Sequence, residues 1–269
     1  MVKGLPVRLM VAFIMLAGLA ACQRVIDVDI TSTAPKLVIE ANLTDVTGTQ
    51  TVLISRSVAY ASSNVFPGVS GATVSFTEGT TGRVYKLKET TTPGTYAITS
   101  FRGRAKTLYT LNVTVDNHVY TASGVMPVGV PLDSLTLTNQ IFGSTKIKTI
   151  AVNYFDPPNE PNQYKFVLYV NNAQVKHIFD ENDNLTDGRV VSSSLYQRDV
   201  DIKSGDVVDV DMQCIDANMY SYWDNLSSQG SNSPQASATP ANPPSNFFNA
   251  DVLGYFSVHT VQRKSILIP

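Results

Sequence analysis

The sequence predicts an all-β protein made of two tandem β-sandwiches, with one short helix in the second. Short runs rich in Val, Ile, Thr, Tyr and Phe recur along the chain and are separated by Gly, Pro, Asn and Asp. Helical periodicity is confined to one stretch near the C-terminus, and a Pro- and Gly-rich stretch at 124–134 divides the strand-like runs into two sets. With 269 residues and 43% hydrophobic content, the chain can fill one or two cores.

The first residues predict export. Lys3 and Arg8 precede about 13 mostly apolar residues, which as a helix would span roughly 20 Å against the roughly 30 Å of a bilayer core. Residues 1–21 therefore indicate a signal peptide and not a membrane span. The run ends in Leu-Ala-Ala-Cys22, which resembles the lipobox of bacterial lipoproteins, where the cysteine is lipidated and becomes the first residue. The alternative is an ordinary secretory signal, with Cys22 incidental.

A lipid on Cys22 would place the protein on a membrane, because two or more acyl chains anchor stably. Residues 22–35 would then form a tether. Gln23 stands where an aspartate, by analogy with enterobacterial sorting, would favour the inner membrane, so we expect the outer membrane, facing either the periplasm or the outside. Without residues 1–21, which hold two of the 20 basic residues and none of the 22 acidic ones, the net charge is near −4. This mild charge argues against nucleic acid as a partner.

The first predicted sandwich covers residues 36–128. Seven strand-like runs in roughly 90 residues are typical of an immunoglobulin-like or fibronectin-like sandwich. Turn residues separate several of them, among them Pro93-Gly94 and Asp116-Asn117. The runs are 36–43, 51–56, 72–78, 83–89, 94–100, 106–116 and 118–124.

The second predicted sandwich covers residues 131–269. Its helix is expected at 217–229, where Tyr220, Trp223 and Leu226 or Ser227 share one face. The prolines of 230–246 predict an extended loop. The strand-like runs are 134–140, 147–155, 164–172, 173–179, 190–202 and 206–216, and residues 250–268 predict two final strands.

No sequence motif for catalysis stands out. There is no nucleophile elbow, P-loop or dinucleotide fingerprint, so we expect neither an enzyme nor a cofactor. A pair of glycosidase-type carboxylates, which would meet only in the folded chain, stays open. His118, His177 and His259 lack zinc spacing and are interpreted as surface or core residues. Cys214, in an alternating run, is interpreted as a small buried hydrophobe and not as a reactive thiol.

The acidic stretch 179–189 has two interpretations. Asp180, Asn182 and Asn184 match the first three ligand positions of a calcium-binding EF-hand loop, which makes them a weak calcium candidate. The glycine and the final glutamate of that loop are missing, since Leu185 and Val191 stand there. The favoured alternative is a solvated hairpin tip over 180–188, and we expect no metal.

Aromatic residues near the C-terminus are the candidate contact residues for a ligand or partner. Tyr222 and Trp223 lie in the predicted helix, and Phe247 and Phe248 follow the proline-rich loop. They could form a platform on which a sugar or peptide stacks. The alternative, which we favour, is that the helix packs its aromatic face on the second sandwich while the loop wraps around it.

Three stretches together resemble one family. They are "PKLVIEANLTD" (35–45), the pattern "VSGATVSFTE", "PGTYAI" and "YTLNVTVD" within 69–116, and "SGDVVDVDMQCIDANMYSYWDNL" with "NPPSNFFNADVLGYFSV" within 204–258. They are similar to Bacteroidota outer-membrane lipoproteins classed as a domain of unknown function and often encoded beside TonB-dependent receptors. The first-domain pattern also resembles carboxypeptidase-regulatory modules. The family resemblance implies a two-sandwich lipoprotein and a transporter partner, and it carries no catalytic residues.

Two functional hypotheses follow. The leading one is a non-enzymatic, lipid-anchored accessory protein of a TonB-dependent outer-membrane transporter, which binds cargo or braces the receptor and uses Gly230–Phe248 as its contact segment. The rival is a surface adhesin or glycan-binding structural lipoprotein, in which the tandem sandwiches act as a spacer.

Overall fold

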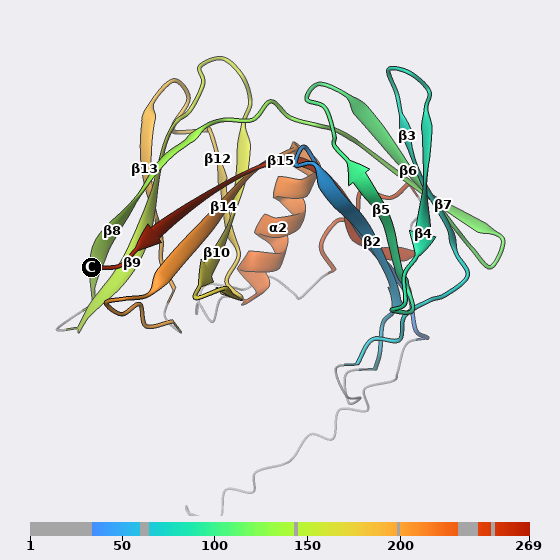
Figure 1. Ribbon diagram of the computed structural model, residues 1–269, viewed down its shortest axis with the longest axis horizontal. Coiled ribbons are helices and arrows are strands. Elements are labelled where there is room, and N and C mark those ends of the chain that lie inside the picture. Colours follow the sequence, from blue (N-terminus) through green and yellow to red (C-terminus); the bar gives the residue numbers. More distant parts are fainter. Residues whose placement is uncertain (1–33, 60–64, 143–144, 198–199, 231–241, 249–250) are drawn as a thin grey trace, which may run out of the picture. The chain divides into compact units, whose positions relative to one another are not determined.

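The computed structural model describes residues 34–59, 65–142, 145–197, 200–230, 242–248 and 251–269 (Figure 1). The predicted signal peptide, Cys22 and nearly all of the tether lie outside these residues. The prediction of an all-β fold with one short helix is confirmed, since the described residues form strands and the single helix α2 (Ala217–Gly230). Among these residues no helix is long and apolar enough to cross a membrane.

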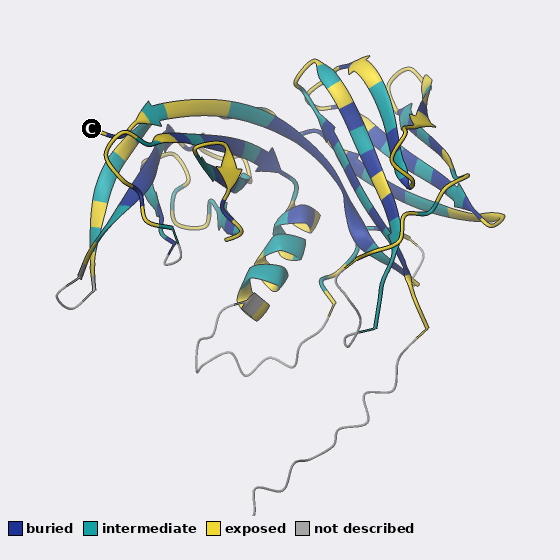
Figure 2. Cartoon of the chain, turned by 60° about the horizontal axis from the view of Figure 1, so that its bottom comes forward, coloured by how far each residue is buried: buried dark blue, intermediate teal, exposed yellow. Residues whose placement is uncertain are grey.

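Each of the seven strand-like runs of the first half forms a strand. Burial alternates with period two along the first, third and sixth of them, as expected when one face of a strand covers a core, and Figure 2 shows such alternation along the ribbons. The strands are β1 (Leu37–Thr44), β2 (Gly48–Arg56), β3 (Thr73–Glu78), β4 (Val84–Glu89), β5 (Thr95–Phe101), β6 (Leu108–Val115) and β7 (His118–Val125).

The second half contains eight strands and the helix. The strands are β8 (Leu132–Phe142), β9 (Thr145–Phe155), β10 (Gln163–Val170), β11 (Ala173–Gln174), β12 (Phe179–Asn182), β13 (Val190–Leu195), β14 (Val207–Ile215) and β15 (Val252–Leu267).

Strands of the first half enclose one hydrophobic core. The hydrogen-bonded order runs β15-β1-β2-β5 and continues through β4-β3-β6-β7, but β4 and β5 are joined by only two residue pairs. The core draws fully buried side chains from both groups of strands, including Ile39, Phe76 and Leu111. Burying one such side chain contributes roughly 1.5–3 kcal/mol, so this core is what fixes the fold of the first half.

A second core lies between the strands β10, β14 and β15 and the separate sheet β13-β9-β8. Tyr164, Phe166 and Val210 are buried in it from the first group, and Ile150 from β9. The predicted linker 124–134 packs into the protein between the two cores. Met126 and Val130 are buried there, and the Val130 amide donates to the sulfur of Cys214 at 3.2 Å. The predicted burial of Cys214 is thereby confirmed.

The prediction of two final strands was wrong, because residues 252–267 form the single strand β15. Its first half pairs in parallel with β1 as far as His259, and from Thr260 onwards it pairs antiparallel with β14. No turn residue interrupts the run after Gly254. In Figure 1, β15 (dark red) ends at the C-terminus on the side of β8 and β9.

β15 supplies side chains to both cores. Phe256 and Val258 are buried among the strands of the first half, and Ile266 packs against the second core. The boundary predicted at 128–131 assigns Phe256 and Val258 to the second sandwich, whereas by packing they belong with the strands of the first.

Two further expectations need correction. The run 173–179 is not continuous, because the chain leaves the edge of β10 after Gln174 and returns to it at Phe179 as β12. Val175 turns into the core at this point while Lys176 and His177 face solvent. The stretch 179–189 is not a hairpin tip either. β12 pairs with β10 and β13 pairs with β9, so this stretch crosses from one sheet to the other.

Candidate functional site

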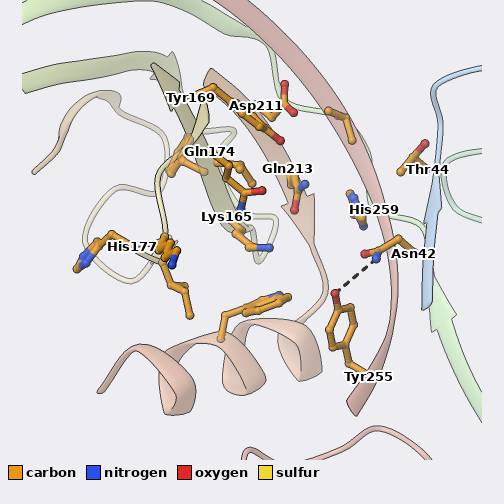
Figure 3. A pocket seen from close by; sticks show the side chains of 16 residues that line it. Asn42, Thr44, Lys165, Tyr169, Gln174, His177, Asp211, Gln213, Tyr255 and His259 are labelled. Atoms are coloured by element: carbon orange, nitrogen blue, oxygen red, sulfur yellow. Dashed lines mark hydrogen bonds between the residues drawn. The ribbon is translucent and has the colours of Figure 1, made fainter. Parts of the chain in front are cut away.

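A pocket of about 560 Å³ opens where β10, β14, β15, α2 and the end of β1 meet (Figure 3). Its residues come from segments up to 219 positions apart, since both Asn42 and Val261 contribute. The lining is mixed, with rings, aliphatic side chains, amides and two lysines. Besides those two residues it comprises Thr44, Lys165, Phe166, Val167, Tyr169, Gln174, Lys176, His177, Ile178, Asp211, Gln213, Trp223, Tyr255 and His259.

The strand walls of the pocket follow from side-chain alternation. On β10, Lys165, Val167 and Tyr169 share one face, while Tyr164 and Phe166 point into the second core. Cross-strand pairing sets Lys165 opposite Gln213 on β14. One face of the sheet therefore presents a row of polar and aromatic groups to the pocket, and the opposite face packs on the second core.

Helix α2 supplies the aromatic wall. Asp216 caps its start, since the Asp216 carboxylate accepts a hydrogen bond from the Met219 amide at 2.9 Å. The rings of Tyr222, Trp223 and Tyr255 pack against one another with centroids 5.0–5.1 Å apart. Burial raises the pKa of Tyr222 to about 12, so its hydroxyl stays protonated at neutral pH. The three rings fix the helix against β15.

Lys165 lies across this wall. Its ammonium is 3.6 Å from the centroid of the Trp223 ring, a close cation–π contact. Burial lowers the pKa of Lys165 to about 8, so the amine is still mostly protonated at pH 7. Among the ion pairs of the described residues, none involves Lys165.

His259 forms part of the rear of the pocket and is almost completely buried, at 3% exposure. Its Nδ1 lies 2.8 Å from the hydroxyl oxygen of Ser257, two residues earlier on the same face of β15. Burial, with the neighbouring charge of Lys165, lowers the pKa of His259 to about 3. The imidazole is therefore neutral at physiological pH and contributes polarity without charge.

Asp211 is the one carboxylate of the pocket lining, and it is already neutralised. Its two oxygens accept hydrogen bonds from Nε and a terminal nitrogen of Arg263 at 2.5 and 2.6 Å. The Arg263 guanidinium also lies 4.9 Å from the ring centroid of Tyr169. This bidentate pair compensates the charge of Asp211 and links the neighbouring strands β14 and β15.

The four predicted contact residues do not gather in one place. Tyr222 and Trp223 lie together on α2, and Trp223 lines the pocket. Phe247 is buried in the first core and bridges to Ala122, whereas Phe248 is 77% exposed. The rings of the helix pack against Tyr255, in the part of β15 that pairs with β1, and of the two phenylalanines one lies inside the first core and one at the surface.

The part of the contact segment 230–248 that the structure describes is anchored to β15. The side-chain amide of Asn246 donates to the Phe256 carbonyl at 2.7 Å and accepts from the Phe256 amide at 2.9 Å. It thus takes up the backbone groups of Phe256, in the part of β15 that precedes its pairing with β14. Residues 231–241 lie outside the described residues, as does Cys22.

Of the three residues of the calcium candidate, Asn182 makes local side-chain hydrogen bonds. The Asn182 amide donates to the Tyr220 hydroxyl at 2.8 Å and accepts from the Asn184 backbone at 3.1 Å. Of the nearby acids, Asp183 and Asp187 accept backbone amides of the loop at 159–162. In the described part of the chain, no group of three His, Cys, Asp or Glu side chains lies together in a way that could hold a metal ion.

Sequence reasoning missed Lys165, Gln213 and His259 as site residues. The only available signal was a single lysine inside the apolar run "QYKFVLYV", which alternation alone would turn away from the core. What the sequence could not show is that β15 passes between β1 and β14, which is what brings these residues together.

Comparisons with known proteins give a match to a family model and matches to 41 chains of solved structures. The family model, described as "Domain of unknown function (DUF4249)", matches residues 23–265. One of the structures is a two-domain fibronectin type III segment from chicken tenascin, 14% identical, which covers 67% of this chain and 90% of its own with a TM-score of 0.23. No curated protein sequence matches.

Proposed function

The chain belongs to the family described as a domain of unknown function, DUF4249, and from this premise we propose that it is a lipid-anchored, non-enzymatic accessory protein of a TonB-dependent transporter system in the bacterial outer membrane. Its role in this proposal is to bind cargo, or the receptor itself, while the lipid on Cys22 holds it at the bilayer. The export signal and the lipobox-like residues before Cys22 support the placement.

The pocket beside α2 is the observation that carries the proposal. Its walls are held by strand pairing, by the Asp216 cap and by the packed rings of Tyr222, Trp223 and Tyr255. A preformed hollow with aromatic and amide groups binds ligands without a large ordering cost. Such a site suits a protein that captures a molecule and passes it on unchanged.

Anchoring makes a weak receptor interface sufficient. A protein and a receptor confined to one membrane meet at a much higher effective concentration than they would in solution. The contact segment 230–248, of which Phe248 is the exposed described end, is the proposed receptor-facing surface.

The test is recovery of the partner from detergent-solubilised outer membranes through a tag on the full chain. We expect a TonB-dependent receptor to copurify with the wild type and to be reduced with Phe248→Ser. Phe155→Ser, at an exposed aromatic of β9, is the matched control and should leave recovery unchanged. Mass spectrometry of the native protein should show a lipid on Cys22. A free thiol there, or no receptor under mild extraction, would contradict the proposal.

A second candidate function is supported by the Trp223 ring and the pocket amides, which also suit a sugar. In this alternative the protein is a surface adhesin or glycan-binding structural lipoprotein. Cleavage by protease added to intact cells, together with glycan binding in a strain that lacks the receptor, would favour it over the transporter role.

A further inference from the structure

The charges that line the pocket do not balance. Lys165 and the exposed Lys176 are cationic, and His259 is neutral because it is buried. The only carboxylate of the lining, Asp211, is held by Arg263 in a bidentate pair. The lining thus carries unmatched positive charge, and Lys165 is its least exposed source.

The position of Lys165 is unfavourable for an empty pocket. A half-buried ammonium that lacks an anionic partner loses much of its hydration, and the contact with Trp223 restores only part of it. A lysine of this length could extend into solvent if no contact held it back. Instead, the ammonium lies on the floor of the pocket, where an incoming group can reach it (Figure 3).

Neutral hydrogen-bonding groups surround this cation. Gln213 lies opposite Lys165 across the β10–β14 ladder, and Asn42 and Thr44 line the pocket from β1. Asn42 is oriented by Tyr255, to whose hydroxyl its amide donates at 3.4 Å. One partly buried cation with several neutral groups, while the second lysine, Lys176, is exposed, matches a ligand of a single negative charge that carries further hydroxyl or amide groups. A phosphate dianion would call for more positive charge.

We propose that the pocket is a binding site for a small organic monocarboxylate, whose carboxylate pairs with Lys165 and whose body lies along Trp223 and Tyr255 and bonds to the amides of Gln213 and Asn42. This deepens the proposed function, on which it rests as a statement about cargo. The volume of about 560 Å³ lies within the range of roughly 300–1,000 Å³ usual for small-ligand sites. It fits a ligand the size of an acidic sugar or a short peptide end, which share this chemistry.

The chain carries its own reporter, because Trp223 is its only tryptophan and lies against Lys165. An anion that pairs with Lys165 alters the charge above the indole ring and so changes its fluorescence. The probes are two matched pairs, glucuronate with glucose and N-acetylleucine with N-acetylleucinamide, titrated into the full chain in detergent. Calorimetry gives the affinity independently of the fluorescence.

We expect a saturable change with the carboxylate of at least one pair, and binding about tenfold or more weaker for its neutral partner. Lys165→Met should lower the carboxylate affinity to that of the neutral partner, and Lys165→Arg should retain most of it. Lys86→Met, at an exposed lysine of β4 outside the pocket lining, should leave it unchanged. The pair that responds identifies the source as an acidic sugar or a peptide end.

Several results would overturn the inference: no response to either carboxylate, equal affinity for charged and neutral partners, or full binding by a folded Lys165→Met chain. If Lys165→Met fails to fold, the Lys165→Arg chain decides. Carboxylate binding by this variant, with a preference for the charged ligand over its neutral partner, would support the inference, and loss of both the binding and the preference would contradict it. Carboxylate binding without receptor recovery would contradict the transporter role alone, whereas receptor recovery without carboxylate binding would contradict this inference alone.

Discussion

Two residues of the pocket lower the stability of the folded protein under particular conditions. Lys165 is charged at neutral pH and, among the described residues, contacts the Trp223 ring without forming an ion pair, and His259 is too buried to accept a proton. Natural chains keep such residues where a site needs them, since packing alone would favour apolar side chains at both positions. Their effects can be separated because the contribution of Lys165 changes with pH only between about pH 8 and 10.5, whereas that of His259 changes only below pH 6.5.

Lys165→Met should stabilise the protein at pH 7. A folded pKa of about 8 against the ordinary 10.5 corresponds to about 3 kcal/mol of destabilisation. The cation–π contact returns at most about 2 kcal/mol, so the net gain is about 1 kcal/mol. The folded lysine loses its proton between pH 8 and 10.5 while the unfolded one keeps it, so the gain should shrink toward pH 10. Urea unfolding at both pH values measures this, and destabilisation by the variant at pH 7 would contradict it.

His259 should make the protein sensitive to acid. Its folded pKa is depressed to about 3 from 6.5, so below pH 6.5 the unfolded chain takes up a proton that the folded chain refuses. The stability is therefore intact above pH 6.5 and falls toward pH 3, by about 3 kcal/mol at pH 4. His259→Gln should flatten the decline measured by urea unfolding between pH 7 and 4. His118→Gln, at an exposed histidine, should decline like the wild type. If the unfolding free energy of all three proteins declines with pH in parallel, His259 is not the cause of the acid sensitivity.

At the scale of single elements, the alternation of side chains sufficed to locate most strands. β1, β3 and β6 lie where period-two patterns predict them, and α2 begins and ends within a residue of its predicted range. The pattern failed where partners decide the outcome. Pairing with two different strands turned 252–267 into one strand, and the run 173–179 is interrupted between β11 and β12. The pocket could not be predicted from the sequence for the same reason, since its residues are brought together only by those strand pairings.

Gly254 makes the pairing of β15 with β1 possible. Its φ of +96° is a backbone conformation that other residues rarely adopt, and a Cβ there would lie 2.1 Å from the Ile39 carbonyl oxygen. Gly254→Ala should therefore lower the free energy of unfolding by at least about 2 kcal/mol. Gly48→Ala is the control, because a Cβ at Gly48 meets nothing within 4 Å. Chemical denaturation of both variants tests this, and equal stability would show that the backbone adapts.

At the scale of the whole molecule, residues 35–269 form one compact unit. The two cores are therefore joined by a strand that they share, β15, and are not two independent modules. The first core contains Phe247, Val252, Phe256 and Val258, all distant in sequence from its other members.

A fragment of residues 35–128 should therefore fail to fold. Without β15, strand β1 loses one neighbour and the first core loses three buried side chains, and it loses a fourth with Phe247. The loss is roughly 6 kcal/mol or more, comparable with the whole stability of a small domain. We expect poor amide dispersion in NMR spectra of the fragment and a single thermal transition for the full chain. A well-dispersed fragment spectrum would show that the first half is autonomous.

The direction of β15 also sets how the protein bears mechanical load. β1 and β15 run parallel over eight residue pairs. When the chain is pulled at the start of β1 and at the far end of β15, these two strands slide lengthwise, and the hydrogen bonds between them resist together. Bonds arranged as in a zipper would instead break one at a time. If the protein is held by its N-terminus and pulled at its C-terminal end, the parallel pair of β1 and β15 would therefore bear the force in shear.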